Sequence, residues 1–284
     1  MNLFLEKLYR FFILIVLRKR GSIINHLGSV IAPTDFSFQT SKKMAYRVGQ
    51  FKYLIRPIIL KQNKMKRYGS KGDGGYVVAK KAIEKSSFLI SGGIESNNEF
   101  EIELAKLGIL GVQIDNSIDL PPKFHENLEF IKATLGDLSE VDINNLTKKF
   151  PKNKSGILKL DFEGSEYLVL KSIHDFNKFN AIIIELHELF LIIDDIFWES
   201  FKKILIRLKN THDVIYISPN NCCGYSIIGG VPVPNVMEIT WVKKSLLAGK
   251  KFSKIDTLHP SKMQGNYSNR AQLDITGFFP AWKL

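Results

Sequence analysis

The chain has 284 residues, of which 45% are hydrophobic and 24% charged, a balance that excludes disordered, collagen-like and multi-span membrane proteins. Its 40 Lys and Arg residues outnumber 28 Asp and Glu residues, and the resulting charge of +12 favours either an anionic partner or a lysine-rich solvated surface. The two cysteines, Cys222 and Cys223, are adjacent, which excludes a disulfide scaffold and favours a reducing compartment.

Residues 1–20 have a pattern of their own. The apolar run 11–17 is only seven residues long, whereas a bilayer span needs about 20. With Lys7, Arg10 and the basic run 18–20, the segment predicts an amphipathic helix on an anionic membrane surface. The alternative is a helix that packs on the domain or on a second copy in a homo-oligomer. We expect a cytoplasmic protein, peripheral on the inner membrane face.

The order of the later elements predicts an α/β fold. Residues 21–66 are expected to form an N-terminal helical extension, and residues 67–284 the main domain. Short apolar runs alternate with helical patterns from Phe88 onward, as in βαβ units with a parallel sheet. Strands are predicted at 88–90, 109–114, 130–133, 157–160, 181–186, 214–217 and 236–242. Helices are predicted at about 97–107, 165–172 and 194–209, and residues 220–235 are expected to form a loop.

Polar residues follow nearly every predicted strand. In open α/β sheets, ligands bind outside the carboxyl ends of the strands, so these residues are the candidates for a site. They are Gly92, Gly93, Asp115, Asp137, Asp161, Glu163, Glu185, His187, Asn220 and Asn221. Such a concentration is more than a purely structural sheet requires.

Two glycine-containing segments admit both a functional and a structural interpretation. Gly92 and Gly93 would let a ligand approach the backbone, and Asp115, 23 residues after Gly92, suits a carboxylate that binds a ribose diol. A tight strand-to-helix turn with an ordinary surface Asp is the structural alternative. Residues 67–78, RYGSKGDGGYVV, indicate backbone packed against something, or simply a hairpin turn.

Several segments together resemble a known family. RYGSKGDGGYVV, FLISGG, QIDNS, ILKLDFEGSEYLVL, IIIELHE, SPNNCCG and VPNVMEITWV are similar to the FkbM-type S-adenosylmethionine-dependent methyltransferases. Within that family, the chain more closely resembles the branch that has an R-x-G-x-x-x-D-G-G-Y segment before the cofactor strand. The resemblance spans about residues 67–242, and the K-[IL]-D-x-E-G-x-E and D-G-G-Y stretches are its specific parts.

The resemblance implies a Rossmann-like, seven-stranded methyltransferase sheet with helices on both faces and S-adenosylmethionine at the strand tips. Ser91, Gly92 and Gly93 would line the methionine and ribose, and Asp115 with Asn116 would hold the ribose hydroxyls. Asp137 would approach the adenine amine. The methionine end would be closed over by Arg67, Asp73, Gly74 and Gly75, and Asp161 would face the reacting centre. The family mostly methylates oxygen, often hydroxyls of sugars, and many bacterial members are linked to surface polysaccharide synthesis.

The chemistry of the candidate residues agrees with methyl transfer to a hydroxyl. A hydroxyl needs its proton removed as the new bond forms, and His187 is the best base because its ordinary pKa lies near neutrality. Asp161 or Glu185 would orient it. The same Asp161, Glu185 and His187, with Glu163 nearby, also form a set that suits a divalent metal ion. Asn220, Asn221 and Glu163 would then contact the acceptor.

Other classes of function stay open. Asp161 and Glu163 resemble the D-x-[DE] metal site of a glycosyltransferase that binds a sugar nucleotide. A non-catalytic, membrane-apposed binding module is the second alternative. RNA methylation is weaker, because the basic residues are scattered and not interleaved with aromatic residues. The leading expectation is an O-methyltransferase that acts on a sugar or a lipid-linked glycan intermediate.

Overall fold

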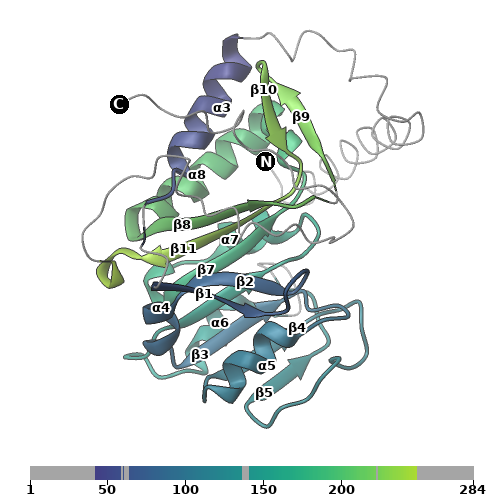
Figure 1. Cartoon of the computed structure of the whole chain (residues 1–284), viewed down its shortest axis with the longest axis vertical. Coiled ribbons are helices and arrows are strands. Elements are labelled where there is room, and N and C mark those ends of the chain that lie inside the picture. The colour runs from purple at the N-terminus through teal and green to yellow at the C-terminus, as the bar shows by residue number, and fades with distance from the viewer. Residues whose placement is uncertain (1–41, 59, 61–63, 136–140, 222, 248–284) are drawn as a thin grey trace.

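The centre of the molecule is a seven-stranded sheet in the order β5-β4-β3-β6-β7-β11-β8 (Figure 1). The computed structural model describes residues 42–58, 60, 64–135, 141–221 and 223–247; the surface helix expected over residues 1–20 lies outside these ranges. The strands are β3 (Phe88–Gly92), β4 (Leu110–Ile114), β5 (Leu128–Ile131), β6 (Gly156–Leu160), β7 (Phe179–Leu186), β8 (His212–Pro219) and β11 (Met237–Lys243). All seven confirm predicted strands.

The sheet is mostly parallel. Strands β5, β4, β3, β6 and β7 pair in parallel, whereas β11 runs antiparallel to both of its neighbours, β7 and β8. The carboxyl ends of six strands therefore meet at one edge, together with the amino end of β11. The fold is a mixed α/β fold with a central sheet flanked by helices, compatible with a Rossmann-like architecture.

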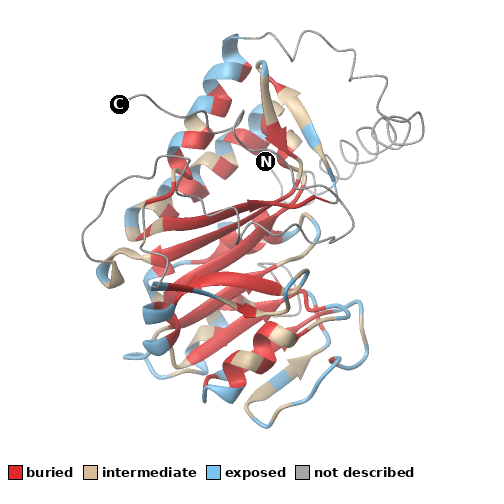
Figure 2. Cartoon of the chain, viewed as in Figure 1, coloured by how far each residue is buried: buried red, intermediate tan, exposed pale blue. Residues whose placement is uncertain are grey.

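Each face of the sheet carries its own core, and the buried residues follow the sheet between the covering layers (Figure 2). One face is covered by α3 (Lys42–Leu54), α6 (Ile143–Lys148), α7 (Glu166–Ser172) and α8 (Asp195–Thr211). The opposite face is covered by α4 (Lys80–Glu84), α5 (Glu99–Lys106) and a hairpin of β1 (Met65–Gly69) and β2 (Gly75–Ala79). Three short 3-10 helices complete the described chain: η2 (Phe176–Lys178), η3 (Leu189–Ile193) and η4 (Lys244–Leu246).

Burial on both faces explains the sequence of the central strands. All eight residues of β7, FNAIIIEL, are buried, as expected for a strand covered on both sides in a parallel sheet. Helix α8 is instead amphipathic: Phe197, Phe201 and Ile204 face the core. Its start is fixed by Asp194, whose carboxylate accepts a hydrogen bond from the Phe197 N–H at 2.8 Å.

Two hairpins lie outside the main sheet. The segment RYGSKGDGGYVV forms the β1–β2 hairpin, which confirms the hairpin interpretation. The loop expected over residues 220–235 is wrong, because it contains a second hairpin of β9 (Tyr225–Ile228) and β10 (Val231–Pro234). Its two-residue turn is Gly229-Gly230, with φ of 58° and 78°, the backbone that tight hairpins require. The apolar–Gly-Gly–apolar pattern carries that signal in the sequence.

His212, at the start of β8, gives the fold a predicted pH dependence. The ring is fully buried and its Nε2 lies 2.9 Å from the Phe179 carbonyl oxygen. Burial lowers the pKa of His212 from 6.5 to about 4, so the unfolded chain binds a proton between these values that the folded chain does not. The free energy of unfolding should therefore fall by about 2 kcal/mol between pH 7 and pH 5 through this residue alone. Urea titrations of the wild type and His212→Gln measure it: equal losses in the two proteins would contradict the prediction.

Candidate functional site

The carboxyl ends of β3 and β6 mark the point where the strand order reverses. From β3 the chain builds β4 and β5 on one side, and then crosses to β6 on the other side. Such a switch point is where open α/β sheets bind ligands. Gly92 and Gly93 stand at the end of β3, and Asp161 at the end of β6. The ladder continues to this edge, since the Asp161 N–H donates to the Gly92 carbonyl at 3.0 Å.

The two glycines of the β3 turn are required by the protein's own packing. A Cβ atom on Gly92 would lie 2.0 Å from Cζ of Phe162, and one on Gly93 would lie 1.7 Å from the Asp161 carbonyl oxygen. Gly93 also has a φ of +74°, which favours glycine. The space beside both glycines is thus occupied by the β6 loop, as the structural interpretation of a tight turn expects. Ser91, just before them, is fully buried and donates to the Glu101 carboxylate of α5.

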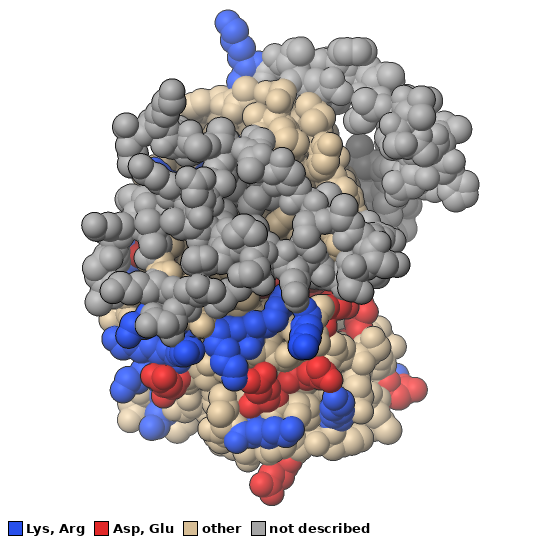
Figure 3. Space-filling model, viewed as in Figure 1, with Lys and Arg blue, Asp and Glu red and all other residues tan. Residues whose placement is uncertain are grey.

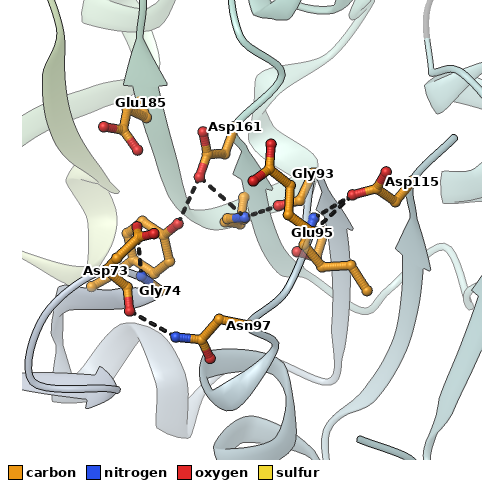
Figure 4. A network of polar contacts seen from close by, with 12 residues as sticks. Asp73, Gly74, Gly93, Glu95, Asn97, Asp115, Asp161 and Glu185 are labelled. Atoms are coloured by element: carbon orange, nitrogen blue, oxygen red, sulfur yellow. Dashed lines mark hydrogen bonds and ion pairs between the residues drawn. The ribbon is translucent and has the colours of Figure 1, made fainter. Parts of the chain in front are cut away.

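Asp115 lies at the end of β4, on the other side of the Gly93 turn from Asp161 (Figure 4). One carboxylate oxygen accepts hydrogen bonds from the N–H groups of Ile94 and Glu95, at 2.8 and 2.9 Å. The other accepts from the N–H and the hydroxyl of Ser117, at 2.8 and 2.6 Å. Burial opposes the charge, but these four hydrogen bonds outweigh it and lower the pKa of Asp115. The carboxylate is ionised and saturated by its own chain.

The β1–β2 hairpin lies over the same edge. Arg67 donates to the Gly75 carbonyl within the hairpin, and the Asp73 carboxylate accepts from the Gly74 N–H at 2.9 Å. The Asn97 amide, in the loop before α5, donates to the Asp73 carbonyl at 2.8 Å (Figure 4). The hairpin is thereby fastened to the β3–α5 loop. The exposed Asp73 is the member of the predicted hairpin set with a side chain open to solvent.

A buried polar network connects the hairpin to the strand tips. The Tyr76 hydroxyl of β2 donates to Asp161 Oδ2 at 3.1 Å. Lys159, which is 3% exposed, donates to the Gly93 carbonyl and places its Nζ 3.6 Å from the same Asp161 oxygen. Burial raises the pKa of Tyr76 well above its ordinary value, and the Asp161 charge raises it further. Tyr76 therefore keeps its proton and donates this hydrogen bond to Asp161.

Asp161, Glu185 and His187 come together as the sequence predicts. One potential ligand atom from each of the three lies within 4.8 Å of the other two. His187 Nε2 is 3.9 Å from Asp161 Oδ1 and 3.6 Å from Glu163 Oε2. Asn220, which follows β8, donates its amide to Glu185 Oε1. Asn221 is also buried, while Glu163 has a side chain that is 69% exposed.

His187 is held from α7 by two consecutive residues. The Glu166 carboxylate accepts from the His187 backbone N–H at 2.7 Å, and the Tyr167 hydroxyl donates to the His187 carbonyl. Glu166 is fully buried and its Oε1 also lies 3.5 Å from His187 Nδ1. Its place in the first turn of α7, inside the KLDFEGSE stretch, was the available signal for this role. Glu166, Tyr167, Tyr76, Lys159 and Glu101 are not among the site residues that the sequence predicts.

The electrostatics of the edge are governed by crowded carboxylates. Burial, followed by the Asp161 charge, raises the pKa of Glu185. Burial also raises the pKa of Glu238, the residue of β11 paired directly with Glu185, to about 7. For His187, burial alone would lower the pKa, but Glu166, Glu185 and Asp161 outweigh it and raise the value well above 6.5. The raised pKa favours the protonated imidazole, which lies with Lys159 among the carboxylates.

Three glutamates at this edge adopt the left-handed backbone conformation. Glu95, Glu163 and Glu188 have φ of 39°, 50° and 55°, and they follow β3, β6 and β7 respectively. Non-glycine residues rarely adopt this conformation, and such residues cluster at sites whose surroundings enforce it.

The surface charge on the face with the hairpin is mixed. Acidic and basic side chains lie close together there, although the whole chain is basic (Figure 3).

Three further predictions concern Asp137, Asn116 and the pair of cysteines. Asp137 lies outside the described residues, and Asn116 is exposed beside Asp115. Cys223 is disulfide-bonded, which differs from the reduced pair that the sequence favours, and Cys222 lies outside the described residues.

Comparison with protein-family models and with curated proteins finds no match to this chain.

Substitutions at Gly92 and Gly93 should differ in whether they can be rescued. Gly92→Ala meets the ring of Phe162, a side chain, whereas Gly93→Ala meets backbone and has an unfavourable φ. Each single change should lower the free energy of unfolding by about 1–3 kcal/mol or more. Adding Phe162→Ala should relieve Gly92→Ala but not Gly93→Ala. Urea unfolding of the single and double variants gives the coupling energies; equal coupling for both glycines would contradict the packing described above.

Proposed function

We propose that the chain is an S-adenosylmethionine-dependent O-methyltransferase that acts on a hydroxyl of a sugar or surface-glycan intermediate. The observation that carries the proposal is the arrangement at the β3–β6 switch point. Asp115 lies on one side of the Gly93 turn, and Asp161, Glu185 and His187 lie on the other. A carboxylate that suits a ribose diol and a cluster that suits proton transfer thus lie near each other, in a seven-stranded sheet with helices on both faces, which supports the proposal.

The residues present fit the two polar parts of the cofactor. A sulfonium is a cation, and the edge supplies Asp161, Glu163 and Glu95 around the place where it would lie. A ribose diol would donate to Asp115. Three of the four donors to Asp115 are backbone N–H groups. The fourth, the Ser117 hydroxyl, can rotate away and is therefore the donor that a ribose hydroxyl would replace.

Methyl transfer requires little covalent chemistry from the protein. The acceptor oxygen attacks the methyl carbon, the carbon–sulfur bond breaks, and the acceptor's proton passes to a base. Alignment supplies most of the rate. The neighbouring carboxylates raise the pKa of His187, and burial raises that of Glu185, so both groups favour their protonated forms and Asp161 would accept the proton. His187 would then position Asp161, whereas the sequence suggests His187 as the base.

Titration calorimetry tests the cofactor first. The full chain should bind S-adenosylhomocysteine and give no heat with nucleotide sugars. Heat from nucleotide sugars alone would favour the glycosyltransferase alternative, and vesicle binding without either would favour a non-catalytic module. Mass spectrometry of candidate sugars incubated with enzyme and cofactor should then show a gain equal to one methylene group.

Asp115 and Ser117 provide a matched pair of variants. Asp115→Asn should weaken S-adenosylhomocysteine binding by about tenfold or more, because it removes charge-assisted hydrogen bonds. Ser117→Ala should leave binding unchanged or tighten it, because it removes the donor that competes with the ribose. Asp119→Asn, an exposed carboxylate paired with Lys132, is the control. Weaker binding by Ser117→Ala than by Asp115→Asn would contradict the placement of the ribose.

A further inference from the structure

The cluster of Asp161, Glu185 and His187 has the composition of a metal site. It offers two carboxylate oxygens and one imidazole nitrogen from the ends of two adjacent strands, β6 and β7. One atom from each residue lies within 4.8 Å of the others, a spacing that one ion among them can span. His187 is 6% exposed and Asp161 has a side chain 20% exposed, so the cluster is sheltered but reachable.

Two of the three side chains are oriented by hydrogen bonds from groups outside the cluster. The Tyr76 hydroxyl occupies Asp161 Oδ2, which leaves Oδ1 directed at His187 Nε2. The Asn220 amide occupies Glu185 Oε1. Outer groups of this kind fix metal ligands in place and are a regular part of metal sites.

The surroundings of His187 are the second, independent observation. Its Nδ1 is buried without a hydrogen bond and faces the fully buried Glu166 carboxylate at 3.5 Å. Its Nε2 faces carboxylates at 3.6 and 3.9 Å, beyond hydrogen-bonding distance. A carboxylate behind one ring nitrogen, with the other nitrogen directed at acidic groups, is the arrangement that prepares histidine to bind a cation.

The neighbouring charges also call for a cation. Glu238 is paired with Glu185 across β11 and β7, and its Oε1 is buried without a hydrogen bond. Of the nearby cations, Lys159 lies between the Gly93 carbonyl and Asp161, and Arg67 donates to the Gly75 carbonyl. Buried carboxylates in contact are stabilised either by protonation or by a positive charge among them.

We propose that Asp161, Glu185 and His187 bind one divalent transition-metal ion, of the Mn²⁺ type, in preference to Mg²⁺ or Ca²⁺. The imidazole nitrogen gives that preference, because Mg²⁺ and Ca²⁺ take oxygen ligands almost exclusively. The ion would place a positive charge among these three side chains. If the proposed methyl transfer is correct, the ion would also bind the acceptor hydroxyl and lower its pKa.

Mn²⁺ binding to the chelator-treated full chain tests the site directly. Titration calorimetry and electron paramagnetic resonance should give one ion per chain. Asp161→Asn, Glu185→Gln and His187→Gln should each weaken binding by more than about tenfold, the lower end of what changes around metal ligands cost. Asp119→Asn removes an exposed acid that is paired with Lys132 and is not part of the cluster, and it should keep affinity within about threefold.

Glu185→Gln also separates loss of a ligand from loss of folding. Glutamine has nearly the same shape as glutamate and can still accept the hydrogen bond from the Asn220 amide, so the metal-free variant should melt no lower than the wild type. Mn²⁺ should raise the melting temperature of the wild type but not of this variant. The proposal would be overturned if the wild type did not bind Mn²⁺, or if all three ligand variants bound Mn²⁺ as tightly as the wild type. Displacement of Mn²⁺ by equimolar Mg²⁺ or Ca²⁺ would overturn the preference.

The same samples distinguish this inference from the proposed function. S-adenosylhomocysteine is titrated with and without Mn²⁺. Binding of the nucleoside by a chain that takes no metal would overturn the metal site and leave methyl transfer intact. Mn²⁺ binding without nucleoside binding would do the reverse.

Discussion

The burial of several carboxylates beside one another, at the carboxyl edge of β6, β7 and the amino end of β11, is the constraint on which the site depends. Asp161, Glu185 and Glu238 cannot all be charged there without positive partners. The chain supplies His187 within the cluster and Lys159 beneath it. The raised pKa values, the donor role of Tyr76 and the suitability for a metal ion all follow from this one arrangement of charge.

The β1–β2 hairpin covers part of that edge. It covers the face of the sheet on which Lys159, Glu185 and Glu238 lie, and it contributes Tyr76 from above. Asn97 joins it to the β3–α5 loop, which Asp115 in turn joins to β4. The groups on the two sides of the Gly93 turn are consequently linked through hydrogen bonds and the Lys159–Asp161 ion pair.

Much of this was accessible from the sequence, and the remainder was not for a definite reason. Apolar runs predicted the seven strands, and the rule that ligands lie at strand ends selected Asp115, Asp161, Glu185 and His187. Tyr76 and Asn220 meet their partners across 85 and 35 residues, and no local pattern reports such contacts. The pattern of a buried strand gives no reason for a lysine at position 159. The reason is its contacts with the Gly93 carbonyl and Asp161, which only the folded structure shows.

The left-handed backbone at Glu95, Glu163 and Glu188 carries a consequence for engineering. Each position holds a charged side chain in a conformation that costs about 1–2 kcal/mol relative to the right-handed one. Replacing these glutamates with glycine would relieve the unfavourable backbone conformation and stabilise the fold. It would also remove negative charge from the edge where the proposed site lies. At these three residues, a substitution that increases thermal stability would therefore weaken the attraction for a cation.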